Sequence, residues 1–232
     1  MTAEEERAEL DARIRVCPLC DLAATRNKAV PGDGPLGAKI MFVGEAPGFH
    51  EDRQGRPFVG QAGSLLRELL HGIGLNRDDV LITNIVKCRP PENRDPHPGE
   101  IAACQPYLDH QLRLFNPRLV VTLGRHSMGK FFPGQMISKI HGQPKRADGR
   151  IYYPLYHPAA VLRSAKLRPQ MDKDFQRIPS LLTEAEAMDQ DVVAVVPLED
   201  GRGGNPSSAP EDAQPPDAVQ NGKTPHQQTS MF

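Results

Sequence analysis

The chain has 232 residues, of which 38% are apolar and 25% are charged, and its formal net charge is −1. These proportions allow one ordinary packed domain with extensions. They exclude a membrane protein, because no run of about 18 apolar residues is present. The acidic start, residues 1–10, lacks the basic and then apolar pattern of a secretion signal, so we expect a cytoplasmic protein without a membrane partner.

Short apolar runs mark the expected strands, which fall at residues 39–44, 80–84, 118–124 and 151–156, the last being the weakest. Longer amphipathic stretches predict helices at 61–73, 98–114, 125–131 and 170–187, with Pro179 as a candidate break in the last. The alternation of strand and helix predicts an α/β fold with a parallel sheet covered by helices on both faces.

The expected topology also indicates where a functional site should lie. Open parallel sheets bind their ligands beyond the carboxyl ends of the strands. The segments that follow the expected strands are therefore the candidates, namely residues 44–48, 84–91, 124–126 and 157–160.

The charge is distributed unevenly along the chain. Residues 1–12 and 184–232 are acidic, whereas residues 13–183 hold 25 Lys and Arg against 15 Asp and Glu. The basic residues are densest between residues 139 and 177. A basic body with acidic ends is typical of a polyanion-binding protein. A solvated basic face without a partner would give the same pattern.

The composition changes after about residue 188. Residues 191–198 (DVVAVVPL) are expected to form an edge strand or to be extended. From residue 201 to residue 230 the only large aliphatic residue is Val219. Such a segment cannot bury enough apolar surface to order itself, which predicts a disordered C-terminal tail.

The chain contains four cysteines: Cys17, Cys20, Cys88 and Cys104. A reducing cytosol disfavours disulfides, and the C-x2-C spacing of the first pair is typical of a metal chelate. Four thiolates can complete a tetrahedral zinc site or hold a [4Fe–4S] cluster. The spacing leaves both open, and unrelated core thiols are the third reading. Either metal centre would fasten the N-terminal segment to the body of the domain.

Four motifs follow one another in the sequence: GEAPGFHED at 44–52, GRPFVG at 55–60, ITNIVKCRP at 82–90 and His-Pro at 157–158. With the four cysteines, they make residues 13–183 resemble the family 4 uracil-DNA glycosylases. The resemblance implies a three-layer α/β/α sandwich around a four-stranded parallel sheet and a [4Fe–4S] cluster on the cysteines. It also implies hydrolysis of the N-glycosidic bond of uracil in DNA, which leaves an abasic site and initiates base excision repair.

The resemblance assigns catalytic roles to three residues. Asn84 is expected to donate to uracil O4 and accept from N3–H, a pairing that cytosine would reverse. His157 should donate to the negative charge that develops on O2, where a preorganised donor is worth on the order of 10²–10³ in rate. Glu45 is expected to orient the water and the uracil rather than act as a strong base.

Other residues are expected to shape the uracil site. Phe58 should stack on the everted base, and the backbone from Gly44 to Ala46 should line the uracil and water sites. Ala46 stands where the family 1 enzymes have a water-activating Asp, so general-base catalysis is expected to be weak. Glu51 is a candidate for excluding the thymine methyl group. The alternatives are a core Phe, a turn Asn and a solvated surface Glu.

The segment after His157 is expected to contact DNA. Leu162 or Arg163 would wedge into the minor groove, and phosphates would be contacted by Lys166, Arg168, Lys145 and Arg146. His141 stands where many relatives have an Arg. Relatives that trap uracil covalently carry a Gln at the position of Ala46 and a His-bearing insertion that this chain lacks, so we expect turnover. His97, in the corresponding loop, is not expected to be a nucleophile.

The last five residues, QTSMF, resemble peptides that dock on the bacterial β sliding clamp, with Gln228, Met231 and Phe232 as anchors. We expect a monomer divided into an acidic extension at 1–12, a uracil-DNA glycosylase domain at 13–187, a flexible acidic linker at 188–227 and a clamp-binding peptide at 228–232.

Two other functions are consistent with the sequence. One is a covalent or non-catalytic uracil-DNA binder on the same fold, which the products of the reaction would reveal. The other is an α/β enzyme that is clamped by zinc and acts on small nucleotides. Such a protein would be colourless, whereas an iron–sulfur protein absorbs at about 400 nm.

Overall fold

The computed structural model describes residues 1–193. Its sheet has the strand order β2-β1-β3-β5-β4. Four strands are parallel to one another, which confirms the four predicted strands: β1 (Ile40–Gly44), β2 (Leu81–Asn84), β3 (Leu119–Leu123) and β5 (Arg150–Leu155). A fifth strand, β4 (Lys145–Ala147), pairs antiparallel with the first half of β5 and was not expected, because its three residues (KRA) form no apolar run and are mostly exposed.

Helices connect the strands. The longer ones are α1 (Ala3–Arg15), α4 (Gln61–His71), α5 (Pro98–Phe115), α9 (Arg168–Phe175) and α10 (Ile178–Val193). The shorter ones are α2 (Leu22–Thr25), α3 (Phe49–Gln54), α6 (Arg125–Phe131), α7 (Ile137–Ile140) and α8 (Pro158–Arg163), with 3-10 turns at η1 (Arg77–Asp79), η2 (Pro91–Asn93) and η3 (Ala165–Leu167). No helix in this part of the chain is long and apolar enough to cross a bilayer.

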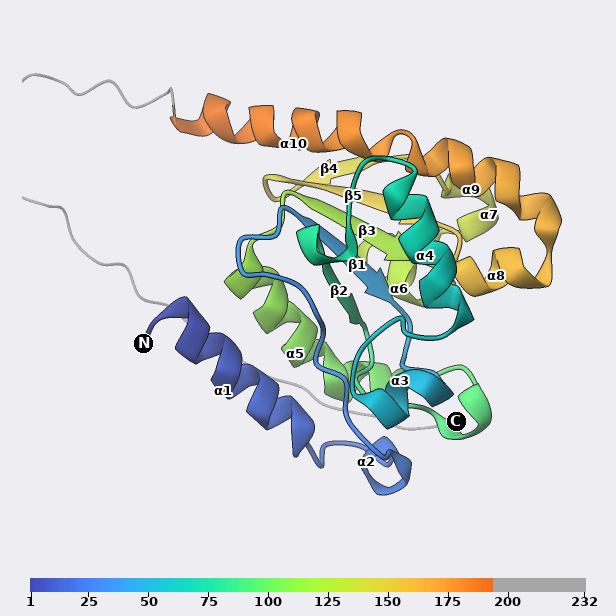
Figure 1. Cartoon of the computed structure of the whole chain (residues 1–232). Helices are drawn as coiled ribbons and strands as arrows, with labels where there is room; N and C mark the ends of the chain where they lie inside the picture. The colour runs from blue at the N-terminus through green and yellow to red at the C-terminus, as the bar shows by residue number, and fades with distance from the viewer. Residues whose placement is uncertain (194–232) are drawn as a thin grey trace, which may run out of the picture. The chain divides into compact units, whose positions relative to one another are not determined.

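Two hydrophobic cores lie on the two faces of the sheet. Because side chains alternate along a strand, Phe42 and Val121 face a core that includes α4, α9 and α10. Met41 and Val120 face the other core, with α1, α5 and α6. Helices cover both faces of the sheet in Figure 1. The three-layer α/β/α sandwich is therefore confirmed, with five strands instead of four.

The helix expected at 170–187 is two helices. α9 ends at Phe175 and α10 begins at Ile178. Pro179 lies in the first turn of α10, where its missing N–H removes no helical hydrogen bond. The expectation of a strand or an extended segment at 191–198 is wrong for residues 191–193, which belong to α10. The remainder of that segment lies outside the described residues, as do residues 201–230.

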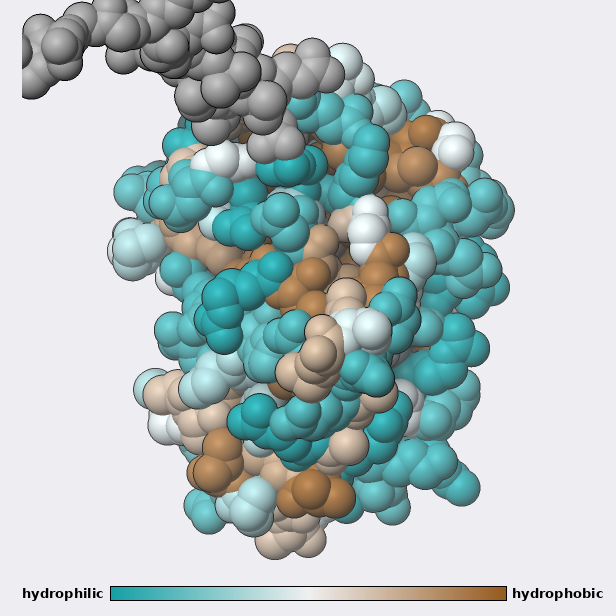
Figure 2. Space-filling view, turned by 90° about the vertical axis from the view of Figure 1, so that its left-hand side faces the viewer, coloured by the Kyte–Doolittle hydropathy of each residue, from teal (hydrophilic) through white to brown (hydrophobic). Residues whose placement is uncertain are grey.

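Helix α1 joins the N-terminal segment to the domain. Thr2 and Glu5 form a capping box at its start, and Leu10 and Ile14 are buried in the core shared with α5. The helix thus runs across the expected boundary at residue 12 and leads directly to Cys17. Hydrophobic residues reach the surface at the lower end of the face shown in Figure 2. Val16 and Leu19, in the connection between α1 and α2, are both exposed.

Candidate functional site

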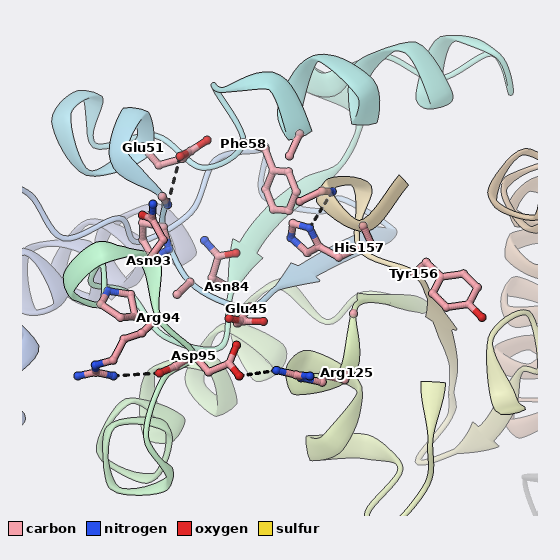
Figure 3. A pocket seen from close by; sticks show the side chains of 18 of the residues that line it. Glu45, Glu51, Phe58, Asn84, Asn93, Arg94, Asp95, Arg125, Tyr156 and His157 are labelled. Carbon is pink, nitrogen blue, oxygen red and sulfur yellow. Dashed lines mark hydrogen bonds and ion pairs between the residues drawn. The ribbon is translucent and has the colours of Figure 1, made fainter. Parts of the chain in front are cut away.

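A cavity of about 460 Å³ lies at the carboxyl edge of the sheet. Every segment that follows a parallel strand contributes to its wall, as the sheet topology predicted. The lining side chains include five of the expected site residues, namely Glu45, Glu51, Phe58, Asn84 and His157, together with Ala46. Figure 3 shows Asn84 between Glu51 and Asn93 on one side and Phe58 and His157 on the other.

Asn84 is the last residue of β2 and is 2% exposed. Its Oδ1 atom is buried and has no hydrogen-bond partner among the described residues. Gly44 is its neighbour in β1. A Cβ atom on Gly44 would lie 2.3 Å from Asn84 Oδ1 and 2.8 Å from Phe58 Cε2, so only glycine allows these two side chains to approach the end of the strand.

Phe58 is buried, and its ring stacks on that of His157 with the centroids 5.6 Å apart. Its backbone has a φ of 51°, which is strained for a residue with a side chain. Arg77 Nη1 donates to the Phe58 carbonyl at 3.0 Å and so helps to fix this conformation. Gly63 packs against the Phe58 backbone, since a Cβ atom on Gly63 would lie 1.8 Å from the Phe58 carbonyl oxygen.

His157 precedes the first turn of α8. Its Nδ1 atom accepts a hydrogen bond from the Ala159 backbone N–H at 3.1 Å, so the proton of the neutral ring is on Nε2. Burial, assisted by the positive charge of Arg163, lowers the pKa of His157 to about 4. The imidazole is therefore neutral at physiological pH and retains one N–H to donate.

Glu45 belongs to a cluster at the other side of the cavity. Its Oε2 atom lies 3.9 Å from His126 Nε2, which lies 3.4 Å from Asp95 Oδ1. Arg125 pairs with Asp95 and donates to His126 Nε2 at 3.0 Å. Burial raises the pKa of the Glu45 carboxyl, with His126 acting in the opposite direction and Asp95 adding to the increase. Because a guanidinium already supplies the cation here, we assign no metal to this cluster.

Glu51 connects two loops. Its Oε2 atom accepts from the Gly48 N–H at 3.1 Å, and its Oε1 atom accepts from the N–H groups of Val59 and Gly60 at 2.9 and 3.0 Å. Both carboxylate oxygens are thus engaged with backbone. The loop after β1 is thereby tied to the loop that carries Phe58.

The four cysteines converge at one place, although 67 residues separate the second from the third. All four line a small pocket between the α1–α2 connection, the end of the 84–88 segment and α5. Arg26 Nη1 donates to Cys88 Sγ at 3.2 Å, and the Lys87 N–H donates to Cys104 Sγ at 3.2 Å. No disulfide joins them.

Lys87 is a residue that the sequence analysis missed. It is 1% exposed, and its ammonium donates to Thr83 Oγ1 at 2.6 Å, to the Asn84 carbonyl at 2.7 Å and to Gln111 Oε1 at 2.7 Å. All three acceptors are neutral. Burial lowers the pKa of Lys87 to about 8. The residue connects the end of β2, which carries Asn84, with the cysteine pocket.

The expected DNA-contacting residues fall into two groups. Arg163 lines the cavity, Leu162 beside it is 51% exposed, and Lys166 lies in η3 just beyond. Arg168 is close by in sequence, but its guanidinium is paired with Asp172 at 2.7 Å and with Glu68 at 2.6 Å.

Lys145 and Arg146 are not brought to the cavity. They pair with Tyr152 and Ile151 in the first half of β5, whereas the cavity lies beyond its end. Arg146 is also paired with Glu184.

Several cavity residues were not singled out from the sequence. Asn93, Arg94 and Asp95 come from the loop after β2, and Tyr156 comes from the end of β5. His141, expected in place of a phosphate-contacting Arg, bonds Asp174 at 2.8 Å and packs against the Tyr156 ring. Of the newly found residues, only Tyr156 stands directly after a strand, whereas Asn93, Arg94 and Asp95 lie beyond the candidate segment 84–91. His97 does not line the cavity and caps α5.

The fold and the site together define a class. A parallel α/β/α sandwich in which an amide with an unpaired oxygen, a neutral imidazole and an aromatic ring line one cavity is suited to binding a planar heterocycle and stabilising negative charge on it.

Comparison with known proteins places the chain within that class. The family model "Uracil DNA glycosylase superfamily" matches residues 31–196. The chain is 49% identical over 177 residues to a type-4 uracil-DNA glycosylase of Sulfurisphaera tokodaii, covering 71% of this chain and 80% of that protein. It is 42% identical to one of Thermotoga maritima, covering 78% of this chain and 97% of that protein. The chain belongs to the uracil-DNA glycosylase superfamily, among the type-4 members.

Proposed function

We propose that this protein hydrolyses the N-glycosidic bond between uracil and deoxyribose in DNA. The observation that carries the proposal is Asn84 Oδ1, a buried acceptor without a partner, in one cavity with Phe58 and the Nε2–H of His157. A buried unpaired acceptor costs about 1–3 kcal/mol, and the N3–H of uracil would satisfy it. Cytosine has no hydrogen at N3, so its pairing with this amide would leave the acceptor unsatisfied.

The reaction breaks the bond between C1′ and N1. Uracil leaves as an anion whose charge spreads to O2, and a water oxygen attacks the cationic sugar. The proton that this water loses balances the charge of the uracil anion, so the products are free uracil and an abasic site. His157 donates from Nε2 to O2 as this charge develops, and it does so as a neutral donor because its pKa is lowered to about 4. Glu45 orients the water, since Ala46 beside it has no side chain for proton transfer. Phe58 and Glu51 complete the pocket walls.

Incubation of the protein with uracil-containing oligonucleotides, followed by alkaline cleavage and analysis of the free base, tests the proposal. We expect free uracil, an abasic site and repeated turnover. The His157→Ala variant should lose at least about a hundredfold in kcat. A stable protein–DNA adduct would instead support the covalent binder, and a full rate in the variant would contradict the site assignment.

We propose that the cysteine pocket holds a [4Fe–4S] cluster. Within residues 1–193, no three cysteine sulfurs lie within 4.8 Å of one another, whereas sulfurs bound to one zinc ion at about 2.3 Å would lie about 3.8 Å apart. The buried Lys87 ammonium has no carboxylate partner in the described chain, so an anionic thiolate-bound group would balance its charge. Cys17, Cys20, Cys88 and Cys104 would hold the cluster, which would supply a structural clamp between the N-terminal segment and the domain.

Partners beyond the substrate follow from the sequence. We propose a monomer that binds DNA through the surface around Leu162, Arg163 and Lys166, and whose last five residues bind the β sliding clamp. Gln228, Met231 and Phe232 lie outside the described residues. About 40 residues before that peptide would give a reach of roughly 35 Å if they behave as a flexible chain.

A further inference from the structure

An exposed aromatic residue follows directly after a segment of the cavity wall. Phe49 begins α3, directly after Gly48, which lines the cavity. Its side chain is 44% exposed, although Phe is a residue that folding usually buries. Figure 3 shows Glu51, which belongs to α3, on the other side of Asn84 from His157.

Two guanidinium groups flank this ring. The Cζ atoms of Arg53 and Arg89 lie over the ring, 5.5 Å and 5.3 Å from its centroid, and the His50 ring meets it edge-on with the two centroids 5.4 Å apart. Within the described chain neither arginine has a carboxylate partner. Arg89 donates from Nε to Asn93 Oδ1 at 2.8 Å, so the group is joined to a residue of the cavity wall.

An exposed aromatic ring with two unneutralised cations matches the chemistry of a nucleotide. Bases stack on aromatic side chains, and arginines pair with the adjoining phosphates. The other side of the cavity shows the same combination, with Leu162 exposed beside Arg163. A strand that places uracil in the cavity would therefore meet an apolar side chain and positive charge on both sides.

We propose that Phe49, Arg53 and Arg89 form a second DNA-contact platform, on which an unpaired base flanking the everted uracil stacks against Phe49. The proposal rests on the proposed function and adds a substrate preference to it. A base can reach the ring only when it is not paired within a duplex. The platform thus favours single-stranded uracil DNA.

Substitutions at Phe49 test the platform, since the side chain is exposed and its loss leaves the core intact. We expect Phe49→Ala to raise KM about tenfold on a single-stranded uracil oligonucleotide, to change KM less on the matching duplex, and to leave kcat unchanged. Phe49→Trp should restore the single-strand KM because it retains the stacking surface. Phe49→Leu should not restore it.

A charge variant and a control complete the experiment. Arg53→Gln should flatten the dependence of log KM on log salt by about 0.7, the value for one phosphate contact in single strands. Arg113→Gln should change nothing, because Arg113 is exposed near the end of α5, at the opposite edge of the sheet from the cavity.

An unchanged single-strand KM in Phe49→Ala, equal rescue by Leu and Trp, or a loss of kcat would each overturn the platform. Failure of the proposed function would look different, because the unaltered protein would then release no uracil from either substrate.

Discussion

At the scale of single residues, the pKa values of two cavity residues, His157 and Glu45, are shifted in opposite directions for the same reason. Burial disfavours the charged form of each. It lowers the pKa of His157 to about 4 and raises that of Glu45 above its usual value of 4.5. The imidazole therefore stays neutral when the pH falls moderately, while the carboxylate is the first to be protonated.

This difference predicts the acid limb of the pH profile. If ionised Glu45 orients the water, kcat should fall as the pH decreases through the raised pKa of Glu45, that is, above about 4.5. His157 should contribute no limb near its ordinary value of about 6.5, because its proton is acquired only near 4. Single-turnover excision rates between pH 4.5 and 8 measure this.

A Glu45→Gln variant serves as the control for that profile. It should be slower and should no longer respond to pH in the acid range, because the amide does not titrate. If the acid limb survives in this variant, another group controls the rate, and the role of Glu45 must be withdrawn.

At the scale of elements, Lys87 links pieces that are distant in the sequence. Its ammonium bonds the end of β2 and Gln111 of α5, and Gln111 Nε2 in turn donates to the Pro31 carbonyl at 2.8 Å. Thr83 Oγ1 donates to the same carbonyl at 2.8 Å. The network fixes the strand end that carries Asn84 against the layer of helices behind it.

Removing the ammonium should therefore destabilise the fold. Lys87→Met fills a similar volume but leaves buried acceptors unpaired, which we expect to cost on the order of 3 kcal/mol. For a domain of this size that lowers the thermal midpoint by roughly 6–12 °C. Differential scanning calorimetry measures it. Lys39→Met is the matched control, because Lys39 is a surface residue paired with Glu186 and such pairs contribute little. Equal midpoints for the two variants would refute the role of Lys87.

Elements differ in how well the sequence predicted them. β1, β2 and β3 are buried throughout, so their residues form continuous apolar runs that are easily recognised. β4 is a short exposed edge strand whose only signal is its pairing with β5. No local pattern could reveal such a strand.

The residues of the site were likewise predictable only where a local sequence motif marks them. Glu45, Phe58, Asn84 and His157 were found because they lie in motifs directly after strands or in the loops beside them. The contact between Glu45 and His126 depends on the packing of separate loops. Burial of Lys87 could not be expected either, because lysine is almost always exposed. Charge density along the chain suggested Lys145 and Arg146 as DNA contacts, but it does not say which end of a strand a residue occupies.

At the scale of the whole molecule, the division of charge assigns different tasks to different segments. The basic residues belong to the part of the chain that folds around the cavity, and the last 49 residues hold nine acidic and two basic residues. A peptide at the end of the chain can then bind a protein partner without adding to the affinity for DNA.

The clamp proposal can be tested at this scale by deletion. Removing residues 228–232 should abolish binding to the β sliding clamp, measured by surface plasmon resonance, because the Met and Phe anchors are lost. The excision rate on free oligonucleotides should not change, since the deleted residues are far along the chain from every cavity residue. Unaltered clamp affinity would contradict the proposal that residues 228–232 bind the clamp. A slower rate on free DNA would show that the tail acts in excision itself.

The positions of the cysteines along the chain have a consequence for biosynthesis. Cys17 and Cys20 leave the ribosome early, but Cys104, which lines the same pocket, is added only after 84 further residues, including β1, β2 and the start of α5. Any inorganic group that needs all four sulfurs can enter only at that stage. Almost half of the polypeptide must therefore be synthesised before the N-terminal helix can be fastened through its cysteines. A nascent chain stalled before Cys104 would leave two thiols, or three once Cys88 has been added, open to oxidation.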